Sequence, residues 1–382
     1  MRIVYFSETL PPLVDGVTLT LGHLFEALEK RGIEFRIYSP INPGERVGWS
    51  SRVQTVPSMV FPLYRDYRLS LPPGPAIAKQ MDALAPHLIH VVSPTPAAIW
   101  AQRYATRRGV PIVTSFHTDF VSYFRYYGFG RFEEQGWAYL RWFYNRCARV
   151  YAPSSTTGRE LQERGIRGVE LWSRGIDLSR FSPTKRCATL RAELGADEHT
   201  PLVLFVGRLV KEKDLEDLVA MHRLLRGRGV AHRVALVGDG PMRPQLEAAL
   251  PDARFTGWLK GDELAKWYAS ADAFVFPSTT ETFGNVVLEA MASGLPTVVV
   301  DRGGPPGLVD VGTTGFITRP HDPVELADAT QTLLEDPARR RAMGQHARNA
   351  AFRYSWAEVN ARLLDSYCLV IREHERAARR AA

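Results

Sequence analysis

Two glutamates flank the start of a short apolar helix near the end of the chain. The stretch FPSTTETFGNVVLEAMASGLPTVVV holds Glu281 just before the predicted helix and Glu289 within it. The helix expected over residues 284–293 is apolar or small on every side except at Glu289, which predicts a buried helix. A lone buried carboxylate is costly unless something pairs with it. We therefore expect Glu289 to accept hydrogen bonds from a ligand diol, such as the two hydroxyls of a ribose. The alternatives are that Glu289 is exposed or pairs with an arginine.

The amino-terminal end of the same helix is a candidate anion site. Its first amides, at Phe283, Gly284 and Asn285, have no partner within the helix and carry the positive end of its dipole. Such an end can hold a phosphate or a sugar hydroxyl, and Glu281 stands directly beside it. Gly294 is expected to end the helix.

Two cations follow another predicted strand, in FVGRLVKEKDLEDLV. Gly207 lets the backbone turn, and Arg208 and Lys213 come just after the strand. A guanidinium and an ammonium beside a helix start can clamp a diphosphate, because Arg binds bidentately and Lys acts as a point charge. The alternative is a solvated helix cap in which Lys213 pairs with Glu212 or Glu216.

The first half of the chain has weaker signals. In ETLPPLVDGVTLTLGHL, Gly16 stands at a helix entrance, where the backbone can approach a phosphate closely. The absence of G-x-G-x-x-G there argues against a dinucleotide oxidoreductase. His117 and Asp119, in TSFHTDF, follow a strand and are expected at a ligand site, although a lone His is more often structural.

The elements that position these residues are short buried strands alternating with amphipathic helices. The strands of the first half are RIVYF, FRIYSP, LIHVVSP, PIVTSFHT and RVYAPS, and VTLTLGHLFEALEKRG is the first crossover helix. After a linker around SRFSPTKRCA, a second series follows: PLVLFVGR, HRVALVGDG, ARFTGW, DAFVFPS, TVVVDRGG and GFIT. Two such series predict an α/β protein with two doubly wound domains, whose ligands bind at the carboxyl ends of the strands.

The predicted boundaries follow from this pattern. Residues 1–182 form the first domain, residues 183–355 the second, and a long helix over 356–382 is expected to cross back onto the first. The length of 382 residues suits two or three domains, and a hydrophobic share of 45% is ordinary for globular domains with buried cores. The three cysteines are widely spaced and indicate no disulfide framework. No apolar run has the length of a signal peptide or a membrane span, so a cytoplasmic protein is expected.

Positive charge gathers in one segment of the first domain. Residues 101–186 hold 15 Arg and Lys against 7 Asp and Glu, within a chain of net charge +7. Thirteen of the 40 aromatic residues lie between positions 116 and 144. Basic residues interleaved with aromatics suit an anionic lipid surface or a nucleic acid. A well-packed helical core in an arginine-rich protein is the alternative.

Taken together, these motifs resemble those of the retaining glycosyltransferases of family 4. Glu281 and Glu289, with seven residues between them, match the E-x7-E signature of that family. GRLVKEK, the Gly-containing amino-terminal loop, SFHTD and SRGIDLSRF follow in the expected order, and the resemblance covers essentially the whole chain. It implies the GT-B fold, with two Rossmann-like domains facing a central cleft. It also implies transfer of a sugar from a nucleotide diphosphate sugar with retention at the anomeric carbon. The first domain, residues 1–182, is then expected to bind the acceptor, and the second, residues 183–355, the nucleotide sugar.

The resemblance assigns a role to each candidate residue. Arg208 and Lys213 neutralise the leaving diphosphate, Glu281 grips the sugar, Glu289 binds ribose, and His117 touches the donor sugar near the reacting carbon. The implied catalytic residues are His117, Arg208, Lys213 and Glu281. The implied donor-binding residues are Gly16, Gly207, Arg208, Lys213, Gly257, Trp258, Leu259, Lys260, Glu281, Phe283, Gly284, Asn285 and Glu289. The implied acceptor residues are Asp15, Asp119, Tyr123 and Arg174.

Within the family, SFHTDFVSYFRYYG with LWSRGIDLSRF most resembles bacterial GDP-mannose-dependent α-mannosyltransferases and lipid glycosyltransferases. The resemblance implies a lipid-linked or glycan acceptor, with the enzyme at the inner face of the cell membrane and no nucleic-acid partner. The loop VFPLYRDYRLSLPPGP is a candidate acceptor-side flap, or a surface loop packed by its own aromatics.

The residue types also bear on the mechanism. No carboxylate is placed as a nucleophile for double displacement, so we favour front-face departure, with the leaving phosphate deprotonating the acceptor. No metal cluster or cofactor is expected. The alternatives are a UDP-glucose- or other UDP-sugar-dependent transferase, a phosphorylase or sugar-phosphate synthase with a soluble acceptor, and a non-catalytic binding module.

Overall fold

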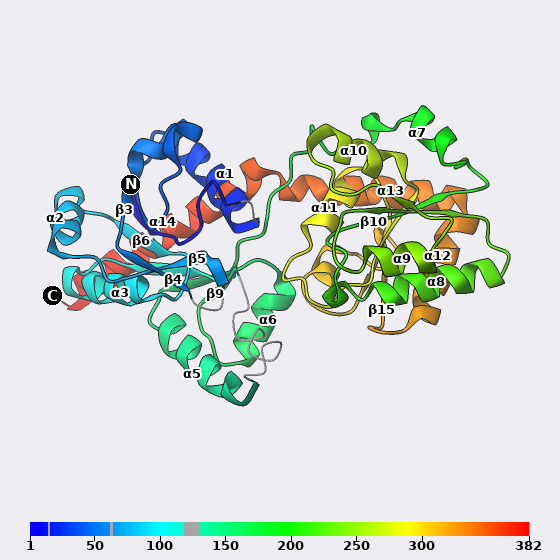
Figure 1. The fold of residues 1–382 in the computed structure, drawn as a ribbon. Helices are drawn as coiled ribbons and strands as arrows, with labels where there is room; N and C mark the ends of the chain where they lie inside the picture. Colours follow the sequence, from blue (N-terminus) through cyan, green and yellow to red (C-terminus); the bar gives the residue numbers. More distant parts are fainter. Residues whose placement is uncertain (14–15, 62–63, 118–129, 382) are drawn as a thin grey trace. The chain divides into compact units, whose positions relative to one another are not determined.

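The chain folds into two compact units. The computed structural model describes residues 1–13, 16–61, 64–117 and 130–381. Unit 1 comprises Met1–Arg174 and Ala357–Ala382, and unit 2 comprises Gly175–Trp356. Unit 2 therefore begins before the predicted boundary at residue 183, because Ile176 and Phe181 are buried in its core. The red helix α14 (Trp356–Ala381), at the end of the chain, lies almost wholly in unit 1 (Figure 1).

Unit 1 is built on a seven-stranded parallel sheet in the order β3-β2-β1-β6-β7-β8-β9. Its strands are β1 (Arg2–Phe6), β2 (Glu34–Ser39), β3 (Val53–Thr55), β6 (Leu88–Val91), β7 (Ile112–Ser115), β8 (Arg149–Ala152) and β9 (Val169–Leu171). Its further described helices are α1 (Gly16–Lys30), α2 (Pro75–Leu84), α3 (Pro96–Arg108), α5 (Glu133–Tyr144) and α6 (Ser155–Glu163).

Both faces of this sheet are buried. Along β1, Ile3 and Tyr5 belong to one core, whereas Val4 and Phe6 belong to another, as the two-residue period of a strand requires. Side chains of α1 and α14 fill the first core. Side chains of α2, α3, α5 and α6 fill the second. The near-continuous apolar strands seen in the sequence are therefore buried on both faces.

Helix α14 is anchored deep in unit 1 by Tyr367. Its hydroxyl lies 2.5 Å from Nδ1 of His90, and Nε2 of His90 lies 3.1 Å from the hydroxyl of Ser115. Burial lowers the pKa of His90 to about 3, so this imidazole is neutral at physiological pH.

One predicted loop proved to be a hairpin. The segment predicted as a flap or surface loop forms two antiparallel strands, β4 (Ser58–Phe61) and β5 (Tyr64–Ser70). The five sequence-predicted strands of the first half are all present. The prediction missed β3 and β9, which are only three residues long, too short to give a periodic signal.

Unit 2 has a six-stranded parallel sheet in the order β12-β11-β10-β13-β14-β15. Its strands are β10 (Leu202–Val206), β11 (Arg233–Val237), β12 (Arg254–Phe255), β13 (Ala273–Phe276), β14 (Thr297–Val300) and β15 (Gly315–Thr318). Its described α-helices are α7 (Ala188–Glu193), α8 (Leu215–Gly227), α9 (Arg243–Ala249), α10 (Gly261–Ser270), α11 (Asn285–Ala292), α12 (Pro323–Glu335) and α13 (Pro337–Ala351). The second predicted series of strands is confirmed in full.

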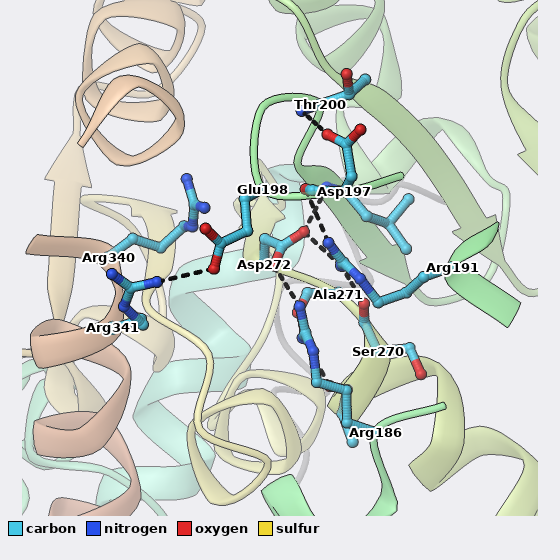
Figure 2. A network of polar contacts seen from close by, with 12 residues as sticks. Arg186, Arg191, Asp197, Glu198, Thr200, Ser270, Ala271, Asp272, Arg340 and Arg341 are labelled. Carbon is cyan, nitrogen blue, oxygen red and sulfur yellow. Dashed lines mark hydrogen bonds and ion pairs between the residues drawn. The ribbon is translucent and has the colours of Figure 1, made fainter. Parts of the chain in front are cut away.

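An ion-pair network fixes the start of unit 2 to its sheet (Figure 2). Asp272, just before β13, accepts hydrogen bonds from Arg186 (2.8 Å), Arg191 (2.6 Å) and the amide of Leu202 (2.8 Å). Arg191 also donates to the carbonyl oxygens of Ser270 and Asp197. The Pro- and charge-rich segment predicted as a linker is therefore held on unit 2 through Arg186, whose side chain is partly exposed and pairs with the buried carboxylate of Asp272.

Both sheets reverse their winding direction once. In unit 1 the reversal lies between β1 and β6, and in unit 2 it lies between β10 and β13. Ligands of doubly wound sheets bind beyond the carboxyl ends of the strands at such points. The predicted α/β class with two doubly wound domains is confirmed, and the cleft between them remains a prediction.

Candidate functional site

The reversal point of unit 2 brings Lys213 and Glu281 together. The loop after β10 carries Arg208 and Lys213, and the loop after β13 carries Glu281. Nζ of Lys213 lies 2.5 Å from Oε1 of Glu281, with side-chain exposures of 14% and 30%. Of the partners considered from the sequence, neither Glu212 nor Glu216 is the one that Lys213 contacts. The two candidate residues therefore form one half-buried ion pair.

Asp214 connects the loop after β10 to the loop after β13 by hydrogen bonds. It has φ = 51°, in the left-handed region that non-glycine residues rarely adopt. Its carboxylate accepts hydrogen bonds from the amide (3.0 Å) and the hydroxyl (2.8 Å) of Thr279. The carbonyl of Glu212 accepts a further bond from Thr280, at 3.0 Å. Asp214 was not a candidate in the sequence, because its partner lies 65 residues away.

Gly303 and Gly304 pack closely against the backbone of Glu281 and Phe283. The amide of Gly304 donates to the carbonyl of Glu281 at 2.6 Å. A Cβ on Gly303 would overlap the backbone of Glu281, and one on Gly304 would overlap that of Phe283. This pair was not a candidate in the sequence, although two glycines that follow a buried strand can mark a close approach of backbones.

Helix α11 begins beside Glu281, as predicted. Gly284 is its N-cap, with φ = 96° and no side-chain cap. Phe283 is buried, and Oδ1 of Asn285 is buried with no hydrogen-bond partner in the described part of the chain. The helix ends at Ala292, and Gly294 follows with φ = 78°. The first turn thus has no side-chain cap and carries the positive end of the helix dipole.

Glu289 is held by a tyrosine that the sequence did not suggest. The hydroxyl of Tyr268, on α10, donates to Oε2 of Glu289 at 2.9 Å. Burial raises the pKa of Glu289 to about 7, although the Tyr268 hydrogen bond and the charge of Arg180 act in the opposite direction. A diol donating to Glu289 would favour its ionised form.

Arg208 is exposed, and within the described residues no hydrogen bond or ion pair involves its guanidinium. Around it the backbone is tightly packed by glycines. The amide of Gly207 donates to the carbonyl of Val237, and the amide of Gly238 donates to the carbonyl of Gly257 at 2.9 Å. A Cβ on Gly238 would overlap the carbonyl of Gly207.

The predicted base-contacting stretch lies next to these glycines. Gly257 is buried with φ = 73°, and Trp258 is 59% exposed. Leu259 is partly buried against the core, and Lys260 is exposed at the start of α10. The stretch offers both backbone groups and an indole ring to a ligand.

In unit 1, hydrogen bonds through Thr20 link Arg174 to Gly16, and His117 packs against Trp172. Arg174 is 5% exposed and donates to the hydroxyl of Thr20 at 2.8 Å. Thr20 in turn donates to the carbonyl of Gly16 at 2.6 Å. The ring of His117 packs edge-on against Trp172, with a centroid separation of 5.4 Å.

His117 is a neutral imidazole in this setting. Burial, followed by the positive charge of Arg174, holds its pKa well below the usual value. Both ring nitrogens are buried, with no hydrogen-bond partner among the residues described. Asp15, Asp119 and Tyr123 lie outside the described residues.

Comparison with known proteins decides the family. Residues 14–180 match the family described as Glycosyltransferase Family 4, and residues 200–336 match Glycosyl transferases group 1. The chain is 34% identical over 374 residues to a GDP-mannose-dependent alpha-mannosyltransferase of Mycobacterium tuberculosis, covering 96% of each chain. This chain is a member of the group 1 and family 4 glycosyltransferases. The family predicted from the sequence motifs is therefore confirmed.

Other relatives span the same length. A GDP-mannose-dependent alpha-mannosyltransferase of Mycolicibacterium smegmatis is 36% identical, over 97% of this chain and 98% of its own. The sulfoquinovosyl transferase SQD2 of Arabidopsis thaliana is 34% identical, over 95% of this chain and 72% of its own.

Solved structures support the fold. The glycosyltransferase has a TM-score of 0.75 against a sucrose-phosphate synthase of Thermosynechococcus elongatus, at 22% identity, covering 97% of this chain and 99% of that one. Against Anabaena HepE in complex with UDP, the TM-score is 0.74 at 20% identity, covering 96% and 99%. The GT-B fold with two Rossmann-like domains is confirmed. In the part of the chain that the structure describes, no helix combines the length and apolar character of a membrane span.

Proposed function

We propose that this glycosyltransferase moves a mannosyl group from GDP-mannose to a lipid-linked or glycan acceptor, with retention of configuration. The observation that carries the proposal is the Lys213–Glu281 pair at the reversal point of unit 2, beside the uncapped first turn of α11. The names of the relatives that are 34–36% identical support the choice of donor.

Electrostatics explain why such a site would accelerate glycosyl transfer. The diphosphate gains negative charge as the glycosidic bond breaks, so fixed positive groups stabilise the transition state more than the ground state. Lys213, Arg208 and the first amides of α11 supply that charge. We propose that Lys213 moves from Glu281 to the diphosphate when the donor binds, which leaves Glu281 to accept hydrogen bonds from the sugar hydroxyls.

The nucleoside end of the donor would use the remaining residues of unit 2. Glu289 would accept hydrogen bonds from the ribose diol. The base would lie against the backbone of residues 257–260, beside the exposed ring of Trp258. Gly16, in unit 1, would approach the distal phosphate.

For the acceptor step we propose front-face departure. The leaving phosphate takes the proton of the acceptor hydroxyl while the anomeric carbon keeps its configuration. His117, which is neutral, would touch the donor sugar through one of its ring nitrogens. Asp15, Asp119, Tyr123 and Arg174 remain the proposed acceptor residues.

Exposed aromatics on α5 support an acceptor at a membrane surface. Tyr139 (38% exposed) stacks on Trp142 (41% exposed) at 5.9 Å, and the guanidinium of Arg146 lies 4.4 Å from the Trp142 ring. Phe132 is 43% exposed beside Arg131. Aromatic rings with adjacent cations suit the headgroup region of an anionic bilayer. We therefore propose peripheral binding at the inner face of the cell membrane.

The second candidate uses a UDP-sugar with the same site. It is supported by the fold shared with the UDP complex of HepE, at 20% identity, which is a weaker likeness than that to the mannosyltransferases. A third candidate, a sugar-phosphate synthase with a soluble acceptor, is supported only by the fold shared with a sucrose-phosphate synthase, at 22% identity.

A thermal-shift panel with GDP, UDP, ADP and their common sugars tests the donor. A ligand at about 100 times its Kd adds about 2.7 kcal/mol to stability, which raises Tm by several degrees. A selective shift with GDP is expected, and a UDP-selective shift would favour the second candidate. Arg208→Ala and Glu281→Ala should each lower turnover by roughly tens- to a thousand-fold, while Glu216→Ala, on the exposed face of α8, serves as the control.

A further inference from the structure

The reversal point of unit 1 carries a carboxylate, Glu8, that has no role so far. Glu8 follows β1, and Ser93 and Thr95 follow the adjacent strand β6. Thr95 is the N-cap of α3, where its side chain accepts from the amide of Ala98. Glu8 therefore occupies the place in unit 1 that corresponds to the place of Lys213 and Glu281 in unit 2.

Among the described residues, Oε1 of Glu8 is the carboxylate oxygen with a hydrogen bond of normal geometry. Oε1 accepts a hydrogen bond from the hydroxyl of Thr95 at 2.7 Å. Oε2 is buried without a hydrogen-bond partner among the described residues, and so is the hydroxyl of Ser70, at the end of β5. The side chain is 1% exposed. A buried acceptor left without a donor is costly, so this oxygen is suited to receive one.

The surroundings of Glu8 favour a hydroxyl donor over a cation. Burial raises the pKa of Glu8 to about 7, and the hydroxyls of Thr95, Ser70 and Ser93 partly oppose this rise. The described groups acting on Glu8 are thus neutral hydroxyls and its own amide. A polyol fits here because each of its hydroxyls can donate to Glu8 and accept from a serine.

We propose that Oε2 of Glu8 accepts a hydrogen bond from a hydroxyl of the acceptor, on a sugar or a glycerol unit, so that unit 1 binds the acceptor at its own reversal point. This inference rests on the proposed function. The acceptor hydroxyl supplies the donor that Oε2 lacks, and Thr95 keeps the carboxylate oriented through Oε1. Glu8 is then an acceptor-binding residue that is distinct from the donor residues of unit 2.

Glu8→Gln is the decisive variant. The amide oxygen of Gln can still accept from Thr95, but its NH2 group cannot accept a hydrogen bond from the ligand. Glu34→Gln, the same change at an exposed glutamate of β2, is the matched control. Transfer from GDP-mannose is measured at pH 8, above the pKa of Glu8, with two acceptor probes: methyl α-D-mannopyranoside, and diacylglycerol in phosphatidylglycerol vesicles. Donor hydrolysis without acceptor and the thermal shift with GDP are measured in parallel.

The expected result is a fall of about 10- to 100-fold in kcat/KM for the better acceptor, the scale of a hydrogen bond to a charged group. Donor hydrolysis and the GDP shift should stay within about twofold. Faster transfer to the mannoside would identify a glycan hydroxyl, and faster transfer to diacylglycerol would identify a glycerolipid hydroxyl.

Two results with the variant would overturn the inference. Unchanged acceptor kinetics in Glu8→Gln would show that Oε2 holds only an internal water. An equal loss of donor hydrolysis would show that Glu8 supports the fold or the donor site. If the wild-type enzyme neither binds GDP nor hydrolyses any nucleotide sugar, the proposed function fails, and this inference fails with it.

Discussion

Replacing Glu289 by Gln should stabilise the ligand-free enzyme at neutral and higher pH. Burial raises the pKa of Glu289 from the ordinary 4.5 to about 7. Gln has nearly the same shape and can still accept the hydrogen bond from Tyr268, but it cannot ionise. The substitution therefore removes the cost of holding a charge in a desolvated site and keeps the local packing.

The size and the sign of the effect follow from the pKa. A rise from 4.5 to about 7 corresponds to about 3 kcal/mol of unfolding free energy, at about 1.4 kcal/mol per pH unit. The folded state holds the proton more tightly than the unfolded state. The cost is therefore absent below pH 4.5, grows between pH 4.5 and about 7, and is constant above.

Urea unfolding and hydrogen–deuterium exchange of the α11 amides, at several pH values between 4.5 and 8, measure the difference. The advantage of Glu289→Gln should reach up to about 3 kcal/mol at pH 8 and vanish near pH 4.5. Glu216→Gln, an exposed residue of the same unit, should give no comparable pH-dependent gain. A variant that is less stable than wild type at pH 8, or a difference independent of pH, would refute the reasoning.

The other predictions concern the supports of the site and the cores. Gly304→Ala should lower turnover roughly tenfold or more, because the added Cβ would displace the backbone next to Glu281. Gly227→Ala is the control: a Cβ at Gly227 meets nothing within 4 Å, so turnover should not change. Asp272→Asn should cost roughly 3–5 kcal/mol in urea unfolding, because it leaves the buried guanidinium of Arg191 without its counter-ion. A cost below about 1 kcal/mol would show that the ion pair contributes little to stability. His90 has a pKa of about 3 in the folded state and about 6.5 in the unfolded state, so the free energy of unfolding should fall as pH drops below 6.5. In His90→Gln the free energy of unfolding should fall less steeply over that pH range. An unchanged slope would show that other groups cause the loss of stability in acid.

The strands and their order of appearance were predictable, because buried parallel strands are continuous apolar runs. Helix α11 was predicted to within two residues, since Gly284 and Gly294 mark both of its ends. The hairpin β4–β5 was not predicted. Its strands are short and hold Arg and aromatic residues, and they pair with each other rather than with a central sheet.

Within the site, single residues were predictable but their partners were not. Lys213 and Glu281 stood out by type and position, whereas their direct ion pair depends on two loops that are far apart in the sequence. Tyr268, Asp214 and Gly304 act through contacts across elements, which no local pattern reports. Glu8 carries no motif, and only the strand order places it beside Thr95.

The most direct test of the central claim is to follow the sugar itself. Proton NMR of the enzyme with GDP-mannose and methyl α-D-mannopyranoside reports the anomeric configuration of the first product formed. We predict an α-linked disaccharide at early times, with the signal greatly reduced in Arg208→Ala and Glu281→Ala. A β-linked product would contradict retention, and no product from any nucleotide sugar, with either acceptor class, would contradict the proposed function.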